Sequence, residues 1–291
     1  MNLKLENKVV NIDEDLKNLI KSQVEGEVYF DEITREIYST DASIYRIVPL
    51  CVAVPKTVND VKALVQISNE YSIPILPRGG GSSLSGQTVN RAIVIDFTKY
   101  INKVIDINKE SMTAIAQPGI TIDNLNLILK KQNLLFTPDP STTNRATVGG
   151  VIGNNSCGAH SIIYGKTIDN VKSLKTILSN GEDHDFKKIR FSEFEKLILN
   201  DSFASKLYLN SINLFKEYTD ELSIRYPDIQ RRVGGYNLDE INKGGYVDLT
   251  KIIVGSEGTL ATVTEAGLNL VELPKSKGLL VIEFDDIIKS M

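Results

Sequence analysis

Residues 77–86, with the sequence PRGGGSSLSG, have the composition of an anion-binding loop. Glycine lacks a Cβ atom and adopts positive φ readily, so the backbone N–H groups of such a loop can surround an anion at close range. We predict that Gly79, Gly80, Gly81, Ser82 and Ser83 supply these donors. Arg78 adds a positive charge that could neutralise a phosphate directly. For this loop taken alone, a glycine-rich surface turn is the alternative interpretation.

The surroundings of the loop argue against the two commonest phosphate-binding folds. An apolar run, residues 73–76, precedes it, and the alternating segment 91–97 predicts a strand after it, without a helix between them. The dinucleotide fingerprint fails because Leu84 stands where its third glycine belongs. Residues 81–88 are one residue short of a P-loop, and Gln87 replaces its lysine. An NTP-binding protein is therefore a disfavoured alternative.

Two more clusters of small residues follow far along the chain. Residues 147–165 read TVGGVIGNNSCGAHSIIYG, after the motif PDPS at 138–141. Residues 255–266 read GSEGTLATVTEA. A ligand with several polar groups along its length, such as a dinucleotide, could contact all three clusters.

The order of these motifs resembles the FAD-binding domain of the vanillyl-alcohol-oxidase (PCMH-type) flavoproteins. The resemblance spans about residues 44–274 and is closest to the branch that contains the D component of glycolate oxidase and the FAD-linked D-lactate and 2-hydroxyglutarate dehydrogenases. Residues 152–161 and 231–240 resemble the matching segments of family members that are fused to, or work with, an iron–sulfur module. The resemblance implies an α+β fold of two α/β subdomains with FAD between them.

The resemblance also assigns cofactor-binding residues. Ser82 stands where some members attach the flavin covalently through histidine, so we expect a non-covalent FAD. The expected cofactor-binding residues are Pro77, Arg78, Gly79, Gly80, Gly81, Ser82, Ser83, Gln87, Pro138, Asp139, Thr147, Gly149, Gly150, Asn154, Gly158, Ala159, Tyr164, Gly165, Glu257 and Gly258.

The expected activity is dehydrogenation of a small 2-hydroxy acid such as D-lactate or glycolate, with electrons passed to a protein or quinone acceptor. Such a reaction needs a proton acceptor near the substrate, for which His160 is a weak candidate, since an isolated histidine is more often structural. In the resembling family the base belongs to a cap domain that this sequence does not contain. We therefore expect an incomplete enzyme as a single chain. The alternative is an FAD-carrying subunit that needs a separate cap chain or an iron–sulfur partner.

The composition of the chain excludes several functional classes. A hydrophobic content of 42%, a charged content of 24% and a net charge of −4 suit a globular protein without a nucleic-acid-binding surface. No apolar run is long enough to cross a bilayer. Two cysteines cannot hold an iron–sulfur cluster, and two histidines argue against a metal site. We expect a cytoplasmic protein, with peripheral attachment to a membrane through a partner as the alternative.

The pattern along the chain predicts its organisation. We expect a helical extension at 1–43, subdomains at about 44–99 and 100–274, and the start of a missing cap domain at 275–291. A capping box at Ser192 should open a helix. Expected helices span 13–22, 57–65, 121–129 and much of 203–226, and expected strands 51–54, 73–76, 93–97, 113–117, 171–178, 252–254, 261–270 and 278–284.

Overall fold

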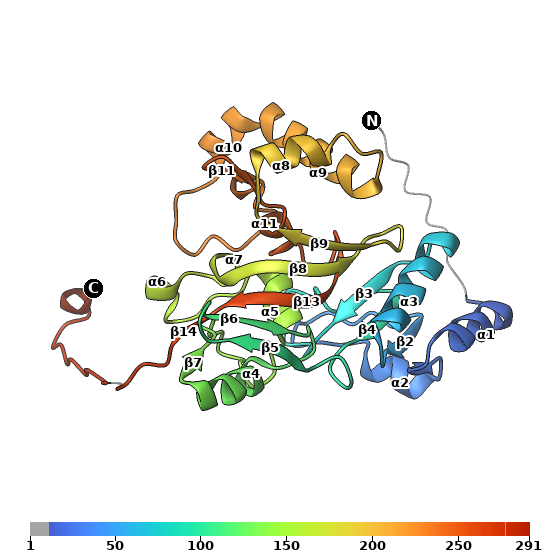
Figure 1. The fold of residues 1–291 in the computed structure, drawn as a ribbon. Helices are drawn as coiled ribbons and strands as arrows, with labels where there is room; N and C mark the ends of the chain where they lie inside the picture. Colours follow the sequence, from blue (N-terminus) through green and yellow to red (C-terminus); the bar gives the residue numbers. More distant parts are fainter. Residues whose placement is uncertain (1–11, 277) are drawn as a thin grey trace.

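The computed structural model describes residues 12–276 and 278–291, which fold around two β-sheets (Figure 1). The first sheet has the order β1-β2-β4-β3, and the second has the order β5-β6-β13-β8-β9. Helices and strands are mixed along the chain, as the α+β expectation requires.

The first sheet is built on a βαβ unit. Strands β2 (Cys51–Val54) and β3 (Ile75–Arg78) both pair in parallel with β4 (Ile93–Asp96), which lies between them. The crossover is α3 (Val58–Tyr71), whose N-terminus is fixed by a capping box between Thr57 and Asp60. All residues of β2 and β4 are buried, as expected for parallel strands covered on both faces. The glycine loop follows β3 directly and leads into β4 without a helix, as predicted.

The N-terminal region is more than a helical extension. Helix α1 (Glu14–Gln23) begins after Asp13, whose side chain accepts a hydrogen bond from the Leu16 N–H. Strand β1 (Glu27–Tyr29) then pairs antiparallel with β2, so this region contributes a strand to the first sheet. A short helix, α2 (Glu32–Ile37), follows.

The second sheet is antiparallel throughout. It consists of β5 (Val104–Asn108), β6 (Thr113–Ala116), β13 (Thr262–Asn269), β8 (Val171–Ile177) and β9 (Asp183–Lys187). Its core includes the buried side chains of Leu174, Leu268 and Ile152. The expected hairpin at Asn180–Gly181 joins β8 to β9, with Gly181 at a φ of 82°. The helices beside this sheet are α4 (Ile122–Leu129), α5 (Val148–Asn154), α6 (Ser161–Tyr164) and α7 (Thr167–Asn170), and a two-stranded ribbon pairs β7 (Leu134–Leu135) with β14 (Val271–Glu272).

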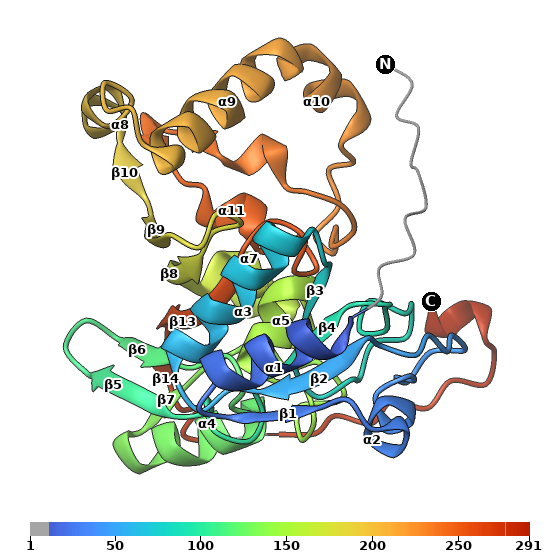
Figure 2. The ribbon, with the colours of Figure 1, turned by 90° about the vertical axis from the view of Figure 1, so that its right-hand side faces the viewer.

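A third, largely helical unit stands beyond β9 (Figures 1 and 2). Tyr208 of this unit packs against His184 and Phe186 of β9 through ring contacts. Two predictions are wrong here: Arg190 with Glu193, not Ser192, caps the first helix, and 252–254 belongs to a helix end rather than a strand. The unit comprises β10 (Ile189–Arg190), α8 (Phe191–Leu197), α9 (Phe203–Glu217), α10 (Thr219–Arg225), β11 (Asn242–Lys243), β12 (Tyr246–Val247) and α11 (Thr250–Ile253).

The segment after β14 leaves the body of the protein (Figure 1). The strand expected at 278–284 is absent from the described residues, because no other strand pairs with this segment. Its apolar side chains are exposed, with Leu279 at 91%. In the described part of the chain no helix is long and apolar enough to span a membrane.

Candidate cofactor-binding site

A cavity of about 660 Å³ lies where the glycine loop, α5 and the turn at 255–258 meet. This volume is in the range of pockets that bind small molecules and cofactors. The expected cofactor-binding residues that line it are Pro77, Arg78, Gly79, Gly80, Gly81, Ser82, Ser83, Gln87, Thr147, Gly149, Gly150, Asn154, Glu257 and Gly258. Three motifs that are far apart in sequence therefore form one site.

The glycine loop offers a row of free backbone donors. Within the described residues, no acceptor takes a hydrogen bond from the backbone N–H groups of residues 79–84. Gly81 has a φ of 63°, a left-handed conformation that favours glycine. Successive N–H groups in such a turn form a concave site for an anion, which supports the predicted role of the loop.

The loop lies directly against the segment that precedes α5. A Cβ atom on Gly80 would be 2.1 Å from the backbone oxygen of Arg145, and one on Gly79 would be 2.1 Å from Oγ1 of Thr147. Neither residue has the positive φ that would by itself demand glycine. The sequence places glycine there because the loop packs against the second subdomain with no room for a side chain.

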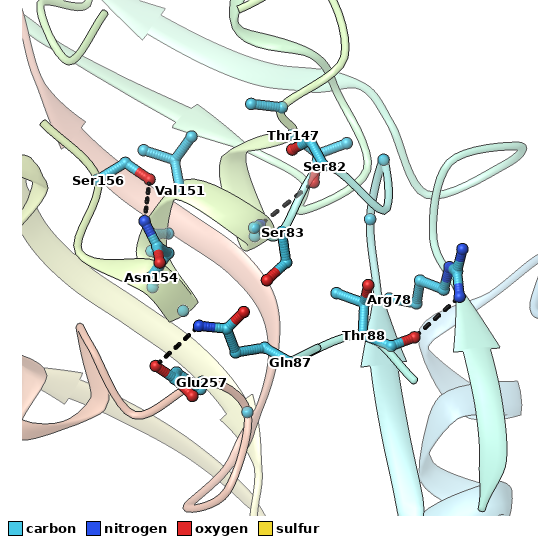
Figure 3. A pocket seen from close by; sticks show the side chains of 18 of the residues that line it. Arg78, Ser82, Ser83, Gln87, Thr88, Thr147, Val151, Asn154, Ser156 and Glu257 are labelled. Atoms are coloured by element: carbon cyan, nitrogen blue, oxygen red, sulfur yellow. Dashed lines mark hydrogen bonds between the residues drawn. The ribbon is translucent and has the colours of Figure 1, made fainter. Parts of the chain in front are cut away.

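Arg78 has a different role from the one predicted. Its guanidinium donates to the backbone oxygens of Tyr38 (3.0 Å), Thr88 (2.8 Å) and Thr40 (2.8 Å). Burial lowers the pKa of this guanidinium, and the nearby Tyr38, Asp41 and Asp96 partly oppose that effect. In Figure 3 the side chain points away from Ser82 and Thr147 toward Thr88. Arg78 therefore braces the loop from behind, and the geometry does not support direct neutralisation of a phosphate.

The second cluster forms α5, and the N–H groups at the start of this helix donate hydrogen bonds to acceptors within the protein. Thr147 caps the helix by accepting from the Gly150 N–H (3.2 Å). The Gly149 N–H donates to the Pro118 oxygen (2.8 Å) and the Val148 N–H to the Ile120 oxygen (2.8 Å). Gly149 and Gly150 line the cavity, but their N–H groups already have partners. The α5 terminus is therefore a wall of the site, while the free donors belong to the loop.

A hydrogen bond from Gln87 to Glu257 connects the loop to the turn at 255–258 (Figure 3). The distance from Gln87 Nε2 to Glu257 Oε1 is 3.3 Å. The Gln87 Oε1 atom is buried and accepts no hydrogen bond from the described residues. A buried acceptor without a donor is uncommon, so this atom can take a hydrogen bond from a bound ligand. Glu257 itself has a φ of 54°, unusual outside glycine.

The other predicted residues lie outside the cavity lining: Pro138, Asp139, Gly158, Ala159, Tyr164 and Gly165. Among them, Asp139 contacts the turn at 158–160, where His160 Nδ1 lies 2.5 Å from Asp139 Oδ2. Pro140, which follows Asp139, and Ser156, two residues before Gly158, do line the cavity.

Sequence reasoning missed several residues that line the cavity. Arg145 contributes an exposed cation, and no salt bridge of the described residues involves it. Its place just before the TVGG motif was a usable signal. The apolar lining was not predicted either. Phe97 and Pro118 lie outside the motifs and gave no signal, whereas Val151, Ile152, Ala261 and Val263 lie within the second and third clusters.

Comparison with known proteins identifies the cofactor. Residues 49–187 match the family model described as FAD binding domain. This segment is an FAD-binding domain. Its N-terminal limit lies just before β2, and the matched segment contains both the glycine loop and α5. The predicted family and the prediction of FAD as the cofactor are therefore confirmed.

The similar proteins are longer than this chain. It is 33% identical over 265 residues to the D-2-hydroxyglutarate dehydrogenase of Escherichia coli K12, covering 88% of this chain but 25% of that protein. It is 32% identical over 271 residues to glycolate oxidase subunit GlcD of Bacillus subtilis 168, covering 91% and 47% respectively. The chain thus spans about a quarter to a half of these relatives.

The solved structures show the fold. An alkyldihydroxyacetonephosphate synthase structure matches 94% of this chain and 44% of its own, with a TM-score of 0.62 and 22% identity. A second structure of a protein with that name, in another crystal form, gives a TM-score of 0.61. The expected α+β FAD-binding fold is therefore confirmed.

Proposed function

We propose that this chain is the flavin domain of an FAD-dependent oxidoreductase that dehydrogenates a small 2-hydroxy acid. The observation that carries the proposal is the cavity beside the glycine loop, into which the loop offers free N–H donors. The relatives named as D-2-hydroxyglutarate dehydrogenase and glycolate oxidase subunit support this substrate class. D-2-Hydroxyglutarate, D-lactate and glycolate are the candidate substrates.

The chain's own residues divide the binding of FAD between them. The N–H groups of residues 79–84 hold the diphosphate, and Arg145 adds the opposite charge. Gln87 Oε1 accepts a hydrogen bond from an O–H or N–H group of the cofactor. Apolar side chains such as Val151 and Ile152 exclude water from the remainder of the cavity. When bound, the flavin supplies a two-electron acceptor for the substrate hydrogen.

Binding is non-covalent in this proposal, because Ser82 of the loop carries a hydroxyl that does not form a stable bond to flavin. Electrons then pass to a protein or quinone acceptor. A cap domain or an iron–sulfur partner chain is the partner in this proposal, and the relatives contain further residues outside the segment that this chain matches. The proposed location is the cytoplasm.

Anaerobic mixing of the FAD-loaded protein with each candidate hydroxy acid tests the activity, once alone and once with a chain that supplies the cap domain. The chain alone should keep its visible flavin absorption, as expected of an incomplete enzyme. With the cap chain, at least one hydroxy acid should remove that absorption and form the matching 2-oxo acid. L-2-Hydroxyglutarate, L-lactate and acetate are controls that should leave the spectrum unchanged. Flavin that none of the hydroxy acids reduces even with the cap chain present would refute the proposed activity without affecting the cofactor assignment.

A further inference from the structure

Residues 226–237 connect two turns that belong to the second and third motifs. The segment runs from the end of α10 to a 3₁₀ turn at Leu238–Glu240 and contains no helix or strand. It descends from the helical unit toward α6 and α7 (Figure 1). All of its residues are described by the structure, and none of them lines the cavity. Its sequence contains RRVGGYN, a motif to which the proposed function gives no role.

At one end the segment binds the chain between α5 and α6. Gln230 Nε2 donates to the backbone oxygens of Ser161 (3.1 Å) and Ile162 (3.0 Å). Arg231 Nη2 donates to the Gly158 oxygen at 2.5 Å. Two successive side chains thus make three hydrogen bonds to the backbone of the second motif, and they fix this end of the segment beside it.

At the other end the segment binds both residues that flank the turn at 255–258. Asn237 is buried, and its Nδ2 donates to the Val254 oxygen at 2.8 Å. The Tyr236 hydroxyl lies 2.7 Å from Thr259 Oγ1. Thr259 Oγ1 uses its own proton in a 2.6 Å hydrogen bond to a backbone oxygen of the turn, so the Tyr236 O–H is the donor in this pair.

The turn at 255–258 in turn contacts the other parts of the cavity wall. The Gly255 N–H donates to the Ile152 oxygen of α5 at 2.9 Å. The Glu257 N–H donates to the Gly153 oxygen of the same helix, also at 2.9 Å. The Glu257 side chain accepts the hydrogen bond from Gln87 of the glycine loop. Hydrogen bonds therefore connect the 226–237 segment, through this turn, to both α5 and the loop.

Contacts inside the helical unit favour a single shape of the segment. Arg232 Nη2 donates to both carboxylate oxygens of Asp239, at 2.7 and 2.8 Å. The Arg232 Cζ atom lies 4.6 Å from the centroid of the Tyr226 ring, and the Tyr226 O–H donates to the Tyr236 oxygen at 2.9 Å. Gly235 has a φ of 76°, a conformation that favours glycine. The two ends of the segment are therefore held at a fixed separation.

We propose that residues 226–237 are a strap that retains bound FAD, with Tyr236 as the positioning residue that fixes the turn at 255–258 in the cavity wall. This inference rests on the FAD binding in the proposed function, and not on the proposed dehydrogenation. The strap contributes no group to the cofactor and acts through the turn. Its weakening should therefore raise the dissociation rate of FAD more than it changes the association rate. Because coupling is reciprocal, bound FAD must also stabilise the strap.

Tyr236→Phe tests the positioning role, because it removes one hydroxyl and keeps the ring. The dissociation rate of FAD should rise by about two- to tenfold, the range expected for the loss of one hydrogen bond. The association rate should change by less than about twofold. Rapid dilution of the FAD-loaded protein, followed by flavin fluorescence, measures dissociation, and circular dichroism checks the fold. A role of Tyr236 in folding alone would lower the Tm and leave the dissociation rate of FAD unchanged.

Gly235→Ala and Gly234→Ala are a matched pair that tests the shape of the strap. A Cβ atom on either residue meets no atom within 4 Å, but only Gly235 of the two has a positive φ. Alanine at 235 strains the strap, so FAD should dissociate at least about threefold faster than from the wild type. Alanine at 234 should leave the dissociation rate unchanged. An equal rise in both variants would overturn the role of the strap.

Hydrogen exchange of the wild-type protein tests the reciprocal effect. Residues 226–237 do not line the cavity, so direct contact with FAD does not protect their amides. FAD should nevertheless slow amide exchange in peptides from this segment by about threefold or more, because it stabilises the turn to which the segment is bound. Peptides from 279–291, which lie outside the body of the protein, are the control and should exchange equally fast with and without FAD.

The outcomes separate the strap from the proposed function. Faster FAD dissociation from Tyr236→Phe and Gly235→Ala but not from Gly234→Ala, with slower exchange of residues 226–237 when FAD is bound, supports the strap. A wild-type dissociation rate in folded Tyr236→Phe, or exchange of the segment that FAD does not change, would overturn it and leave the proposed function standing. Hydroxy-acid oxidation enters neither measurement, so its failure would contradict the proposed activity alone.

Discussion

Gly80→Ala is the sharpest test of how the glycine loop binds FAD. The added Cβ would lie 2.1 Å from the Arg145 backbone oxygen, whereas ordinary contacts begin at 3.4 Å. The loop and the 145–147 segment would have to separate by the difference, 1.3 Å. Backbone atoms on both sides resist this, and overpacking of this kind costs about 1–3 kcal/mol of folding stability.

The effect on FAD should exceed the effect on folding. A hydrogen bond to a charged group contributes about 1.5–3 kcal/mol, so displacing two loop N–H donors from the diphosphate removes about 3–6 kcal/mol of binding free energy. The Kd for FAD should therefore rise by about a hundredfold or more. Quenching of flavin fluorescence during titration of the apoprotein measures this change, and thermal denaturation should show a fall of a few degrees in Tm.

Two other glycines make this prediction specific. Gly234→Ala meets no atom within 4 Å and should leave both the Tm and the Kd for FAD unchanged. Gly150→Ala meets Thr147 Oγ1 at 3.4 Å, and its N–H already has a partner, so the Kd should change by less than about tenfold. Wild-type affinity in Gly80→Ala, with the fold intact by circular dichroism, would refute the assignment of the loop as the diphosphate site.

Three further predictions concern neighbouring features. Arg78→Met should lower the free energy of unfolding of the apoprotein by about 2–4 kcal/mol in urea denaturation, because three backbone oxygens lose their donor; an effect on FAD affinity alone would contradict the bracing role. Burial lowers the pKa of His184 in the folded protein, so the free energy of unfolding should be highest above the unfolded pKa of about 6.5 and should fall as the pH drops toward the folded pKa. His184→Gln should flatten this pH dependence of the free energy of unfolding, and a profile equal to the wild type's would contradict the prediction. Acid precipitation should release all flavin into the supernatant as FAD, whereas yellow colour in the pellet would show a covalent bond.

The regular elements near the site were predictable because their signals are local. The crossover helix after Thr57 shows its capping box in the sequence, and β2 and β4 show as apolar runs. The helix α11 was mistaken for a strand because Ile252, Ile253 and Val254 are strongly β-prone, and tertiary packing overrides such a preference. The strand predicted at 278–284 is absent for a related reason, because its apolar residues form a strand only where another strand pairs with them.

Most of the predicted cofactor-binding residues line the cavity, but their contacts could not be predicted. Arg78 is among them, yet the three carbonyls that hold it come from residues 38, 40 and 88, which no local pattern connects to the loop. Arg145 lines the cavity because Gly80 packs against its backbone, a contact between segments more than sixty residues apart. Roles of this kind depend on the approach of two subdomains, which the sequence pattern does not specify.

Glycine has opposite roles on the two sides of the cavity. In the loop, glycine at 79 and 80 lets the backbone pass close to the 145–147 segment while its N–H groups stay free. In α5, Gly149 packs against Pro118 and its N–H donates to the same residue's oxygen. A free donor favours an anionic ligand, whereas a donor with a partner favours a rigid wall. Because the rigid side holds the free side in place, the diphosphate meets donors that are already aligned, and less ordering entropy opposes binding.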